Sequence, residues 1–182
     1  HLLDTPPDVV ISGINNGSNL GSDIMYSGTV SAAMEAAYLG VRGIAISLSN
    51  HNADSIYYAR AANLLCEMLD TLLSLPLSAD TVLNVNYPVR APFAGVRFTK
   101  AGINLYNDTF VAGERDGGVR LKGVPVEHDG NPDNCDVELI KKGFVTVTPL
   151  RLDRNDYDGL ARLQHTDVFN RFAPTSGKTE RN

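Results

Sequence analysis

The sequence contains little cysteine, no long apolar run and no excess of positive charge. Its two cysteines, Cys66 and Cys135, lie far apart, which excludes a disulfide framework and the paired-cysteine spacing of zinc knuckles. A reducing cytoplasm is therefore the expected location. No apolar run approaches the roughly 20 residues that a membrane-spanning helix needs, and no signal peptide is visible. The net charge of -5 predicts no binding to nucleic-acid polymers.

The chain also lacks the common motifs of nucleotide-binding proteins and hydrolases. There is no GxGxxG after the first predicted strand, no GxxxxGK[ST] and no GxSxG nucleophile elbow. The histidines at positions 1, 51, 128 and 165 have no metal-ligand spacing, and each is expected in a loop or on the surface. The chain begins at His1, without an initiator methionine.

The composition is that of a globular protein with a substantial core. The 182 residues are 43% hydrophobic and 20% charged, which suits one domain. The first half alternates apolar strands with helices, and this order implies a parallel sheet with right-handed crossovers. The predicted strands are Asp8–Ser12, Val41–Leu48 and Thr81–Tyr87, and the predicted helices are Thr29–Leu39 and Ser55–Leu73.

The second half indicates more strands and turns. The turn signal Asp116-Gly117-Gly118 predicts a hairpin within Leu105–Gly123. Residues 128–136 (HDGNPDNCD) have the composition of a loop. Further strands are predicted at Gly95–Lys100 and Gly143–Leu150, a closing helix at Asp158–Phe172, and a polar, disordered tail from Pro174.

The segment Ser12–Thr29 (SGINNGSNLGSDIMYSGT) is rich in glycine, amides and hydroxyls and carries almost no charge. It follows the first predicted strand and leads into the first predicted helix, where open α/β sheets bind ligands. Ser27, Gly28 and Thr29 lie at the start of that helix. Free N–H groups and hydroxyls at a helix start suit a phosphate.

Asn15, Asn16 and Asn19 add amide oxygens to this segment, and such oxygens are hard ligands for Mg²⁺, Mn²⁺ or Ca²⁺. Each feature also has a purely structural explanation. Ser27 or Thr29, taken alone, is more often a helix cap, and glycines and asparagines shape turns. The length, low charge and location of the whole loop favour a binding site.

Residues 7–49, PDVVISGINNGSNLGSDIMYSGTVSAAMEAAYLGVRGIAISLS, closely resemble the signature region of the SurE family of metal-dependent nucleotidases and acid phosphatases. The match is ungapped, and it continues more loosely through LNVNYP, GVRFTKAG and KKGFVTVTPL. The resemblance implies a SurE-like three-layer α/β/α fold with a mostly parallel sheet, a C-terminal β-hairpin extension and a tail helix.

The resemblance also implies roles for individual residues. Asn15 matches a ligand of a divalent metal, Mg²⁺ or Mn²⁺, and Asn19 matches a position beside the metal and the substrate phosphate. Ser27, Gly28 and Thr29 match the step that holds the phosphate. The implied reaction is hydrolysis of a nucleoside 5′- or 3′-monophosphate, or another phosphomonoester, to the alcohol and phosphate.

The sequence departs from the family at its start. Members of the family begin with an N-D-D-G strand whose aspartate pair, with a later serine, completes the metal site. Asp4 and Asp8 lie at or before the start of the first predicted strand, which is the wrong end for the site, and Asp23 is unpaired. We therefore expect that the sequence lacks an N-terminal βα segment with the catalytic aspartates, and that the printed polypeptide has little or no activity.

The resemblance divides the chain into one SurE-like domain at 1–172 and a disordered tail at 173–182. Within the domain, 1–100 is the α/β core, 101–150 the hairpin and C-terminal strands, and 151–172 the tail helix. The hairpin and tail are expected to join copies into a homodimer or homotetramer. Cys135 departs from a Gly-Thr-Asp-like turn of the family, and no role is assigned to it.

Two alternatives to an enzyme of this family remain at the level of sequence. The first is a non-catalytic nucleotide- or phosphate-binding α/β module, which the absent carboxylates favour. The second is an unrelated α/β hydrolase, against which the missing nucleophile elbow argues.

Overall fold

The computed structural model describes residues 3–113 and 117–166, in two compact units, 1–152 and 153–182. The predicted disordered tail, the last part of the predicted tail helix and the first residue of the predicted hairpin turn, Asp116, lie outside the described residues. The assignment of 1–172 to a single domain stays a prediction.

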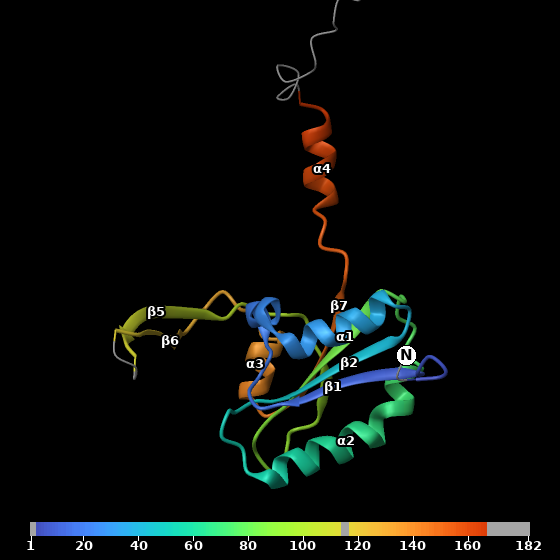
Figure 1. Cartoon of the computed structure of the whole chain (residues 1–182), viewed down its shortest axis with the longest axis horizontal. Coiled ribbons are helices and arrows are strands. Elements are labelled where there is room, and N and C mark those ends of the chain that lie inside the picture. Colours follow the sequence, from blue (N-terminus) through green and yellow to red (C-terminus); the bar gives the residue numbers. More distant parts are fainter. Residues whose placement is uncertain (1–2, 114–116, 167–182) are drawn as a thin grey trace, which may run out of the picture. The chain divides into compact units, whose positions relative to one another are not determined.

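A five-stranded sheet forms the centre of the first unit (Figure 1). Neighbouring strands run parallel except β3 and β7, which pair antiparallel. The mostly parallel sheet predicted from the sequence is therefore confirmed. The strand order is β1 (Val9–Asn15), β2 (Arg42–Leu48), β3 (Thr81–Tyr87), β7 (Val145–Arg151) and β4 (Val96–Phe98).

Two helices cover opposite faces of this sheet and complete the three predicted layers (Figure 1). Helix α2 (Ser55–Leu73) buries Ala61, Leu65 and Leu72, which lie on one face at helical spacing, against large aliphatic side chains of the sheet. Helix α1 (Gly28–Tyr38) packs more closely through small residues on the other face. A Cβ atom at Gly43 would lie 2.1 Å from the carbonyl oxygen of Ala33 in α1.

Strand β1 extends three residues beyond the predicted end at Ser12. The extension passes through Gly13, whose φ of 127° few other residues adopt. A Cβ atom there would lie 2.3 Å from the carbonyl oxygen of Ile46 in β2, so glycine permits this close approach. The pairing register with β2 shifts between Ser12 and Asn15. Gly13, which the sequence analysis placed in the loop segment, thus lies within β1. It allows the strand to continue to Asn15 at the carboxyl edge of the sheet.

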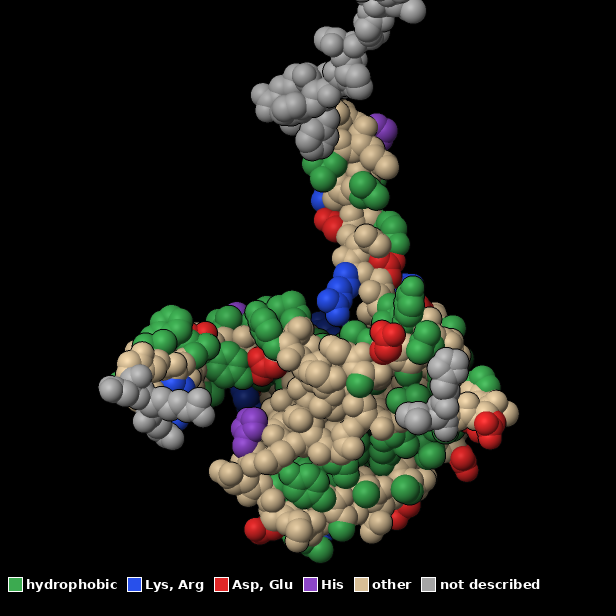
Figure 2. Space-filling model, in the orientation of Figure 1, with side chains coloured by type: hydrophobic (Ala, Val, Ile, Leu, Met, Phe, Trp, Pro, Cys, Tyr) green, Lys and Arg blue, Asp and Glu red, His purple; other side chains and the backbone are tan. Residues whose placement is uncertain are grey.

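A second sheet consists of the predicted hairpin, β5 (Leu105–Ala112) and β6 (Val119–Val126), paired antiparallel. Both strands are largely exposed, and hydrophobic side chains gather on the hairpin (Figure 2). The predicted hairpin extension is confirmed. In the second unit, helix α4 (Tyr157–Gln164) begins where the Asp156 side chain accepts a hydrogen bond from Gly159 N–H.

The sequence did not predict helix α3 (Asp136–Lys141), which begins where residues 128–136 were expected to form a loop only. The fully buried Asp136 carboxylate explains the helix start, because it accepts hydrogen bonds from the main-chain N–H groups of Gly21 (2.9 Å), Gly102 (2.8 Å) and Val137 (2.8 Å). Burial raises the pKa of Asp136, and these N–H donors act against that rise. One carboxylate thus ties together three segments that are distant in sequence.

We predict that Asp136→Asn lowers the free energy of unfolding by about 1–3 kcal/mol, because an amide N–H₂ would face the Gly21 N–H and leave that donor unpaired. Denaturant unfolding of both proteins measures the difference. Asp133→Asn is the control, since that side chain is 99% exposed, and it should change stability by less than about 0.5 kcal/mol. Equal effects of the two substitutions would contradict the role of Asp136.

Candidate functional site

The segment Ser12–Thr29 lies across the carboxyl ends of β1, β2 and β3. Asn15 is the last residue of β1, and Asn19 contacts side chains from the last part of β2 and of β3. This is the edge at which ligands bind in open parallel sheets. The structure therefore brings the predicted binding segment to the position that the βαβ order implied.

The Asn86 side chain holds the main chain of this loop in two directions. Asn19 N–H donates to Asn86 Oδ1 (2.9 Å), and Asn86 Nδ2 donates back to the carbonyl oxygen of Asn19 (3.0 Å). The same carbonyl accepts from Asn84 Nδ2 at 2.7 Å. Asn86 and Asn84 are both fully buried, so water does not compete for these bonds and the loop is fixed at Asn19.

Asn19 itself is buried, with 7% of its surface exposed. Its Nδ2 donates to Ser47 Oγ in β2 at 2.7 Å, which leaves Oδ1 as the side-chain atom for a ligand. The hydrogen bonds give Asn19 a structural role that sequence reasoning did not identify. Its predicted place beside the phosphate stays a prediction.

The sheet face beneath this loop is polar at its carboxyl end. Pairing places Ser47, Asn86 and Thr146 in one row across β2, β3 and β7, on the face that α1 covers. Among the described residues, Asn84 Oδ1 and Thr146 Oγ1 are buried without a hydrogen-bond partner. Each such group costs about 1–3 kcal/mol, so this face of the sheet is more polar at its carboxyl end than packing alone would favour.

The loop is also held from the side of the hairpin. Between Asn19 and α1 it forms the 3₁₀ helix η1 (Gly21–Tyr26), which was not predicted. The Asp23 carboxylate of η1 accepts hydrogen bonds from Asn104 Nδ2 (2.9 Å) and the Tyr106 hydroxyl (2.7 Å). Burial and the bond to Asp23 raise the pKa of Tyr106 to about 12. Asp23, which the sequence left unpaired, thus connects η1 to the base of the hairpin.

The start of α1 combines a cap with two open N–H groups. Ser27 Oγ accepts a hydrogen bond from Val30 N–H at 3.1 Å, so the capping interpretation of Ser27 is confirmed. Within the described part of the chain, no acceptor pairs with the N–H groups of Gly28 or Thr29. Gly28 is exposed, and a Cβ atom there would meet open space. These N–H groups are therefore accessible to an anion, as helix N-termini often are.

Asn15 points its amide in a defined direction, because its Nδ2 donates to the carbonyl oxygen of Gly17 at 2.8 Å. The amide oxygen is then the atom that can bind a cation. One amide oxygen cannot hold Mg²⁺ or Mn²⁺ against water, since such sites usually include carboxylates. Residues 3–113 and 117–166 contain no group of three or more His, Cys, Asp or Glu side chains that could hold a metal ion. The described residues therefore do not form a complete metal centre.

A histidine that sequence reasoning placed only in a loop or on the surface contacts the residues that directly follow Asn15. His51 follows β2 by a short turn and is exposed, and its Nδ1 lies 2.9 Å from the carbonyl oxygen of Asn16. Its position just after a predicted parallel strand was the one signal in the sequence that could have assigned it to the site.

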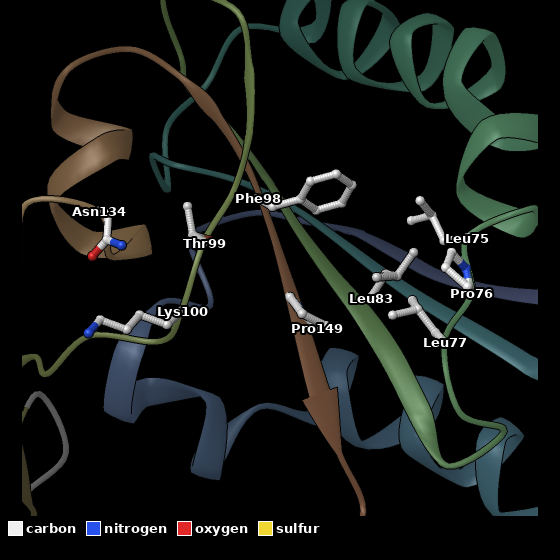
Figure 3. A pocket seen from close by; sticks show the side chains of 9 residues that line it. All are labelled: Leu75, Pro76, Leu77, Leu83, Phe98, Thr99, Lys100, Asn134 and Pro149. Atoms are coloured by element: carbon white, nitrogen blue, oxygen red, sulfur yellow. The ribbon is translucent and has the colours of Figure 1, made fainter.

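A cavity of about 390 Å³ lies elsewhere and is mainly apolar (Figure 3). Leu75 and Leu77 line it from the segment after α2, and Phe98 of β4 and Pro149 of β7 line it from the sheet. None of the predicted site residues lines this cavity. It does not contribute to the candidate site.

Comparison with known proteins gives a consistent set of relatives. Residues 1–108 match the family model described as Survival protein SurE. The chain is 36% identical over 174 residues to the 5′-nucleotidase SurE of Alkaliphilus metalliredigens and 39% identical over 179 residues to that of Synechococcus elongatus. These alignments cover 92% and 90% of the chain but 66% of each relative, so the chain spans about two thirds of the length of these curated relatives.

The fold has a counterpart among solved structures. The crystal structure of a SurE protein from Aquifex aeolicus superimposes with a TM-score of 0.71 at 32% sequence identity. The match covers 88% of this chain and 66% of that chain. Among the described residues, no helix combines the length and apolar character needed to cross a membrane.

We predict that Asn86→Ala lowers the free energy of unfolding by about 1–3 kcal/mol, because it removes the only side chain that pairs with Asn19 N–H in the described structure. Amide hydrogen exchange at Asn19 and Gly21 should also become faster in the variant, whereas exchange in β2 should change less.

Asn63→Ala is the matched control, since Asn63 is exposed on α2 and should change stability by less than about 0.5 kcal/mol. Unchanged exchange at Asn19 in the Asn86→Ala protein would show that the amide pairing does not hold the loop.

Proposed function

The chain belongs to the SurE family, and from that premise we propose that the protein hydrolyses nucleoside 5′- or 3′-monophosphates to nucleoside and phosphate. The observation that carries the proposal is the loop at the carboxyl edge of the sheet. It presents the open N–H groups of Gly28 and Thr29 on the same segment as the Asn15 amide oxygen. This combination suits a phosphate group.

The phosphate binds at the start of α1 in this proposal. Gly28 and Thr29 donate main-chain N–H bonds to its oxygens, and the hydroxyls of Ser27 and Thr29 add to them. The partial positive charge of the helix N-terminus stabilises negative charge on those oxygens. We call this phosphate-binding position at the start of α1 the phosphate seat. Asn19 supports the seat, because its main chain is fixed by buried amides.

A divalent cation, Mg²⁺ or Mn²⁺, completes the proposed site, with Asn15 as one ligand. The carboxylates that such an ion needs are not gathered around Asn15 in the described residues. We therefore expect the printed polypeptide, tested by itself, to bind the cation weakly and to release little phosphate. Other phosphomonoesters are also proposed substrates, as for an acid phosphatase, because the seat contacts the phosphate group alone.

Two further properties belong to the proposal. The exposed hairpin and the tail helix join copies into a homodimer or homotetramer. The protein acts in the cytoplasm, which its two free cysteines fit.

The second candidate function is a non-catalytic nucleotide- or phosphate-binding module. The lack of a cluster of metal-binding side chains in the described residues favours it. Both candidates use the same phosphate seat, so binding of phosphate cannot separate them. Turnover in the protein expressed from its complete natural reading frame separates them.

We predict that the protein expressed from its complete natural reading frame releases phosphate from nucleoside monophosphates with Mn²⁺ or Mg²⁺. This release should stop when a chelator removes the metal. Asn15→Ala should lower kcat/KM by more than roughly a hundredfold, since even the loss of an outer-shell partner of a metal typically costs about 10–100-fold. Phosphate release at several metal concentrations measures both effects.

Asn63→Ala, on the exposed face of α2, should leave kcat/KM unchanged. Full activity of Asn15→Ala would remove the assigned role of Asn15. Saturable nucleotide binding without phosphate release, with either metal, would support the non-catalytic module instead.

A further inference from the structure

His51 is fixed against the loop by a hydrogen bond and by packing. Its Nδ1 lies 2.9 Å from the carbonyl oxygen of Asn16. The ring covers Gly17, which is buried, and a Cβ atom at Gly17 would lie 2.2 Å from Cε1 of His51. Glycine at position 17 therefore makes room for this imidazole.

The hydrogen bond also determines which ring nitrogen can exchange a proton. A carbonyl oxygen only accepts, so Nδ1 must carry the proton that is shared with Asn16. Nε2 is then the nitrogen that gains or loses a proton, while Nδ1–H keeps the ring oriented. A main-chain carbonyl orients many histidines that transfer protons or bind metals in this way.

The ring lies against the two residues that follow the proposed metal ligand Asn15. Asn16 and Gly17 directly follow Asn15, so the residues that His51 contacts are within about 8 Å of Asn15 along the chain. His51 is exposed, so a ligand at the carboxyl edge can reach it. Its own turn is ordered by a hydrogen bond from Asn52 N–H to Asn50 Oδ1 at 3.2 Å.

Hydrolysis of a nucleoside monophosphate needs a proton on the leaving oxygen, because an alkoxide is a poor leaving group. We infer that His51 supplies that proton from Nε2 to the ester oxygen of the nucleoside, as the general acid of the reaction. This inference rests on the proposed phosphomonoesterase function. Positioned acids of this kind contribute about 10²–10⁴-fold to the rate.

The step balances without a further reagent. Water adds its oxygen to phosphorus and loses a proton to solvent. The bond between phosphorus and the ester oxygen breaks, and its electron pair goes to that oxygen, which takes the proton from Nε2. The imidazole then regains a proton from solvent, and the products are the nucleoside and phosphate.

The test uses two variants and two substrates with the protein expressed from its complete natural reading frame. His51→Asn places an amide N–H₂ near the position of Nδ1 and keeps the bond to Asn16, whereas His51→Ala removes both ring nitrogens. A nucleoside monophosphate has a leaving group that needs a proton. p-Nitrophenyl phosphate releases a stable phenolate that does not.

Both variants should lower kcat for the nucleoside monophosphate by roughly a hundredfold or more and change kcat for p-nitrophenyl phosphate less than about tenfold. Asn63→Ala, at an exposed position of α2, is the control and should change neither rate. Equal losses on both substrates would overturn the assignment, because a merely structural role affects both. Unchanged rates would overturn it as well.

The outcome for the unsubstituted protein separates the two proposals. If it hydrolyses both substrates and the variants behave as the control does, the proposed function stands and the role of His51 falls. If it releases phosphate from neither substrate, the proposed function fails and the role of His51 fails with it.

Discussion

The loop at the edge of the sheet depends on the pairing between the Asn86 side chain and the main chain of Asn19. One amide group satisfies both the N–H and the carbonyl of that residue, as a neighbouring strand would. The bonds are buried, so breaking them would leave polar groups without water. Along β3, the face toward α1 changes from Val82 to Asn84 and Asn86. At its carboxyl end the sheet therefore has buried amide side chains, which hold the loop, in place of apolar side chains.

The remaining contacts extend this anchoring to both ends of the segment. The Asp136 carboxylate holds Gly21, and the Asp23 carboxylate connects η1 to Asn104 and Tyr106. The open N–H groups at the start of α1 follow directly after η1. A seat held in this way is preorganised, and preorganised dipoles stabilise charge without a cost of rearrangement during the reaction. In our proposal the phosphate binds there, and the metal ligand Asn15 and the proton donor His51 act on it from the carboxyl ends of β1 and β2.

Local patterns in the sequence predicted most of the fold, because strands and helices follow from the spacing of apolar residues. The bounds of α2 and β3 agree with the prediction. The contacts that hold the site could not be predicted in this way. Asp136 and Gly21 are 115 residues apart, and Asn86 and Asn19 are 67 apart, so no local pattern joins them. Asn15 and the start of α1 were found because one continuous segment contains them, whereas His51 comes from another strand end.

The central claim is that the start of α1 is a preformed seat for phosphate. A crystal structure of the protein expressed from its complete natural reading frame, with inorganic phosphate bound, tests it most directly. The account predicts a phosphate within hydrogen-bonding distance of the main-chain N–H groups of Gly28 and Thr29, with the pairing of Asn86 and Asn19 unchanged. A phosphate bound at the carboxyl edge without contact to these N–H groups would contradict the account.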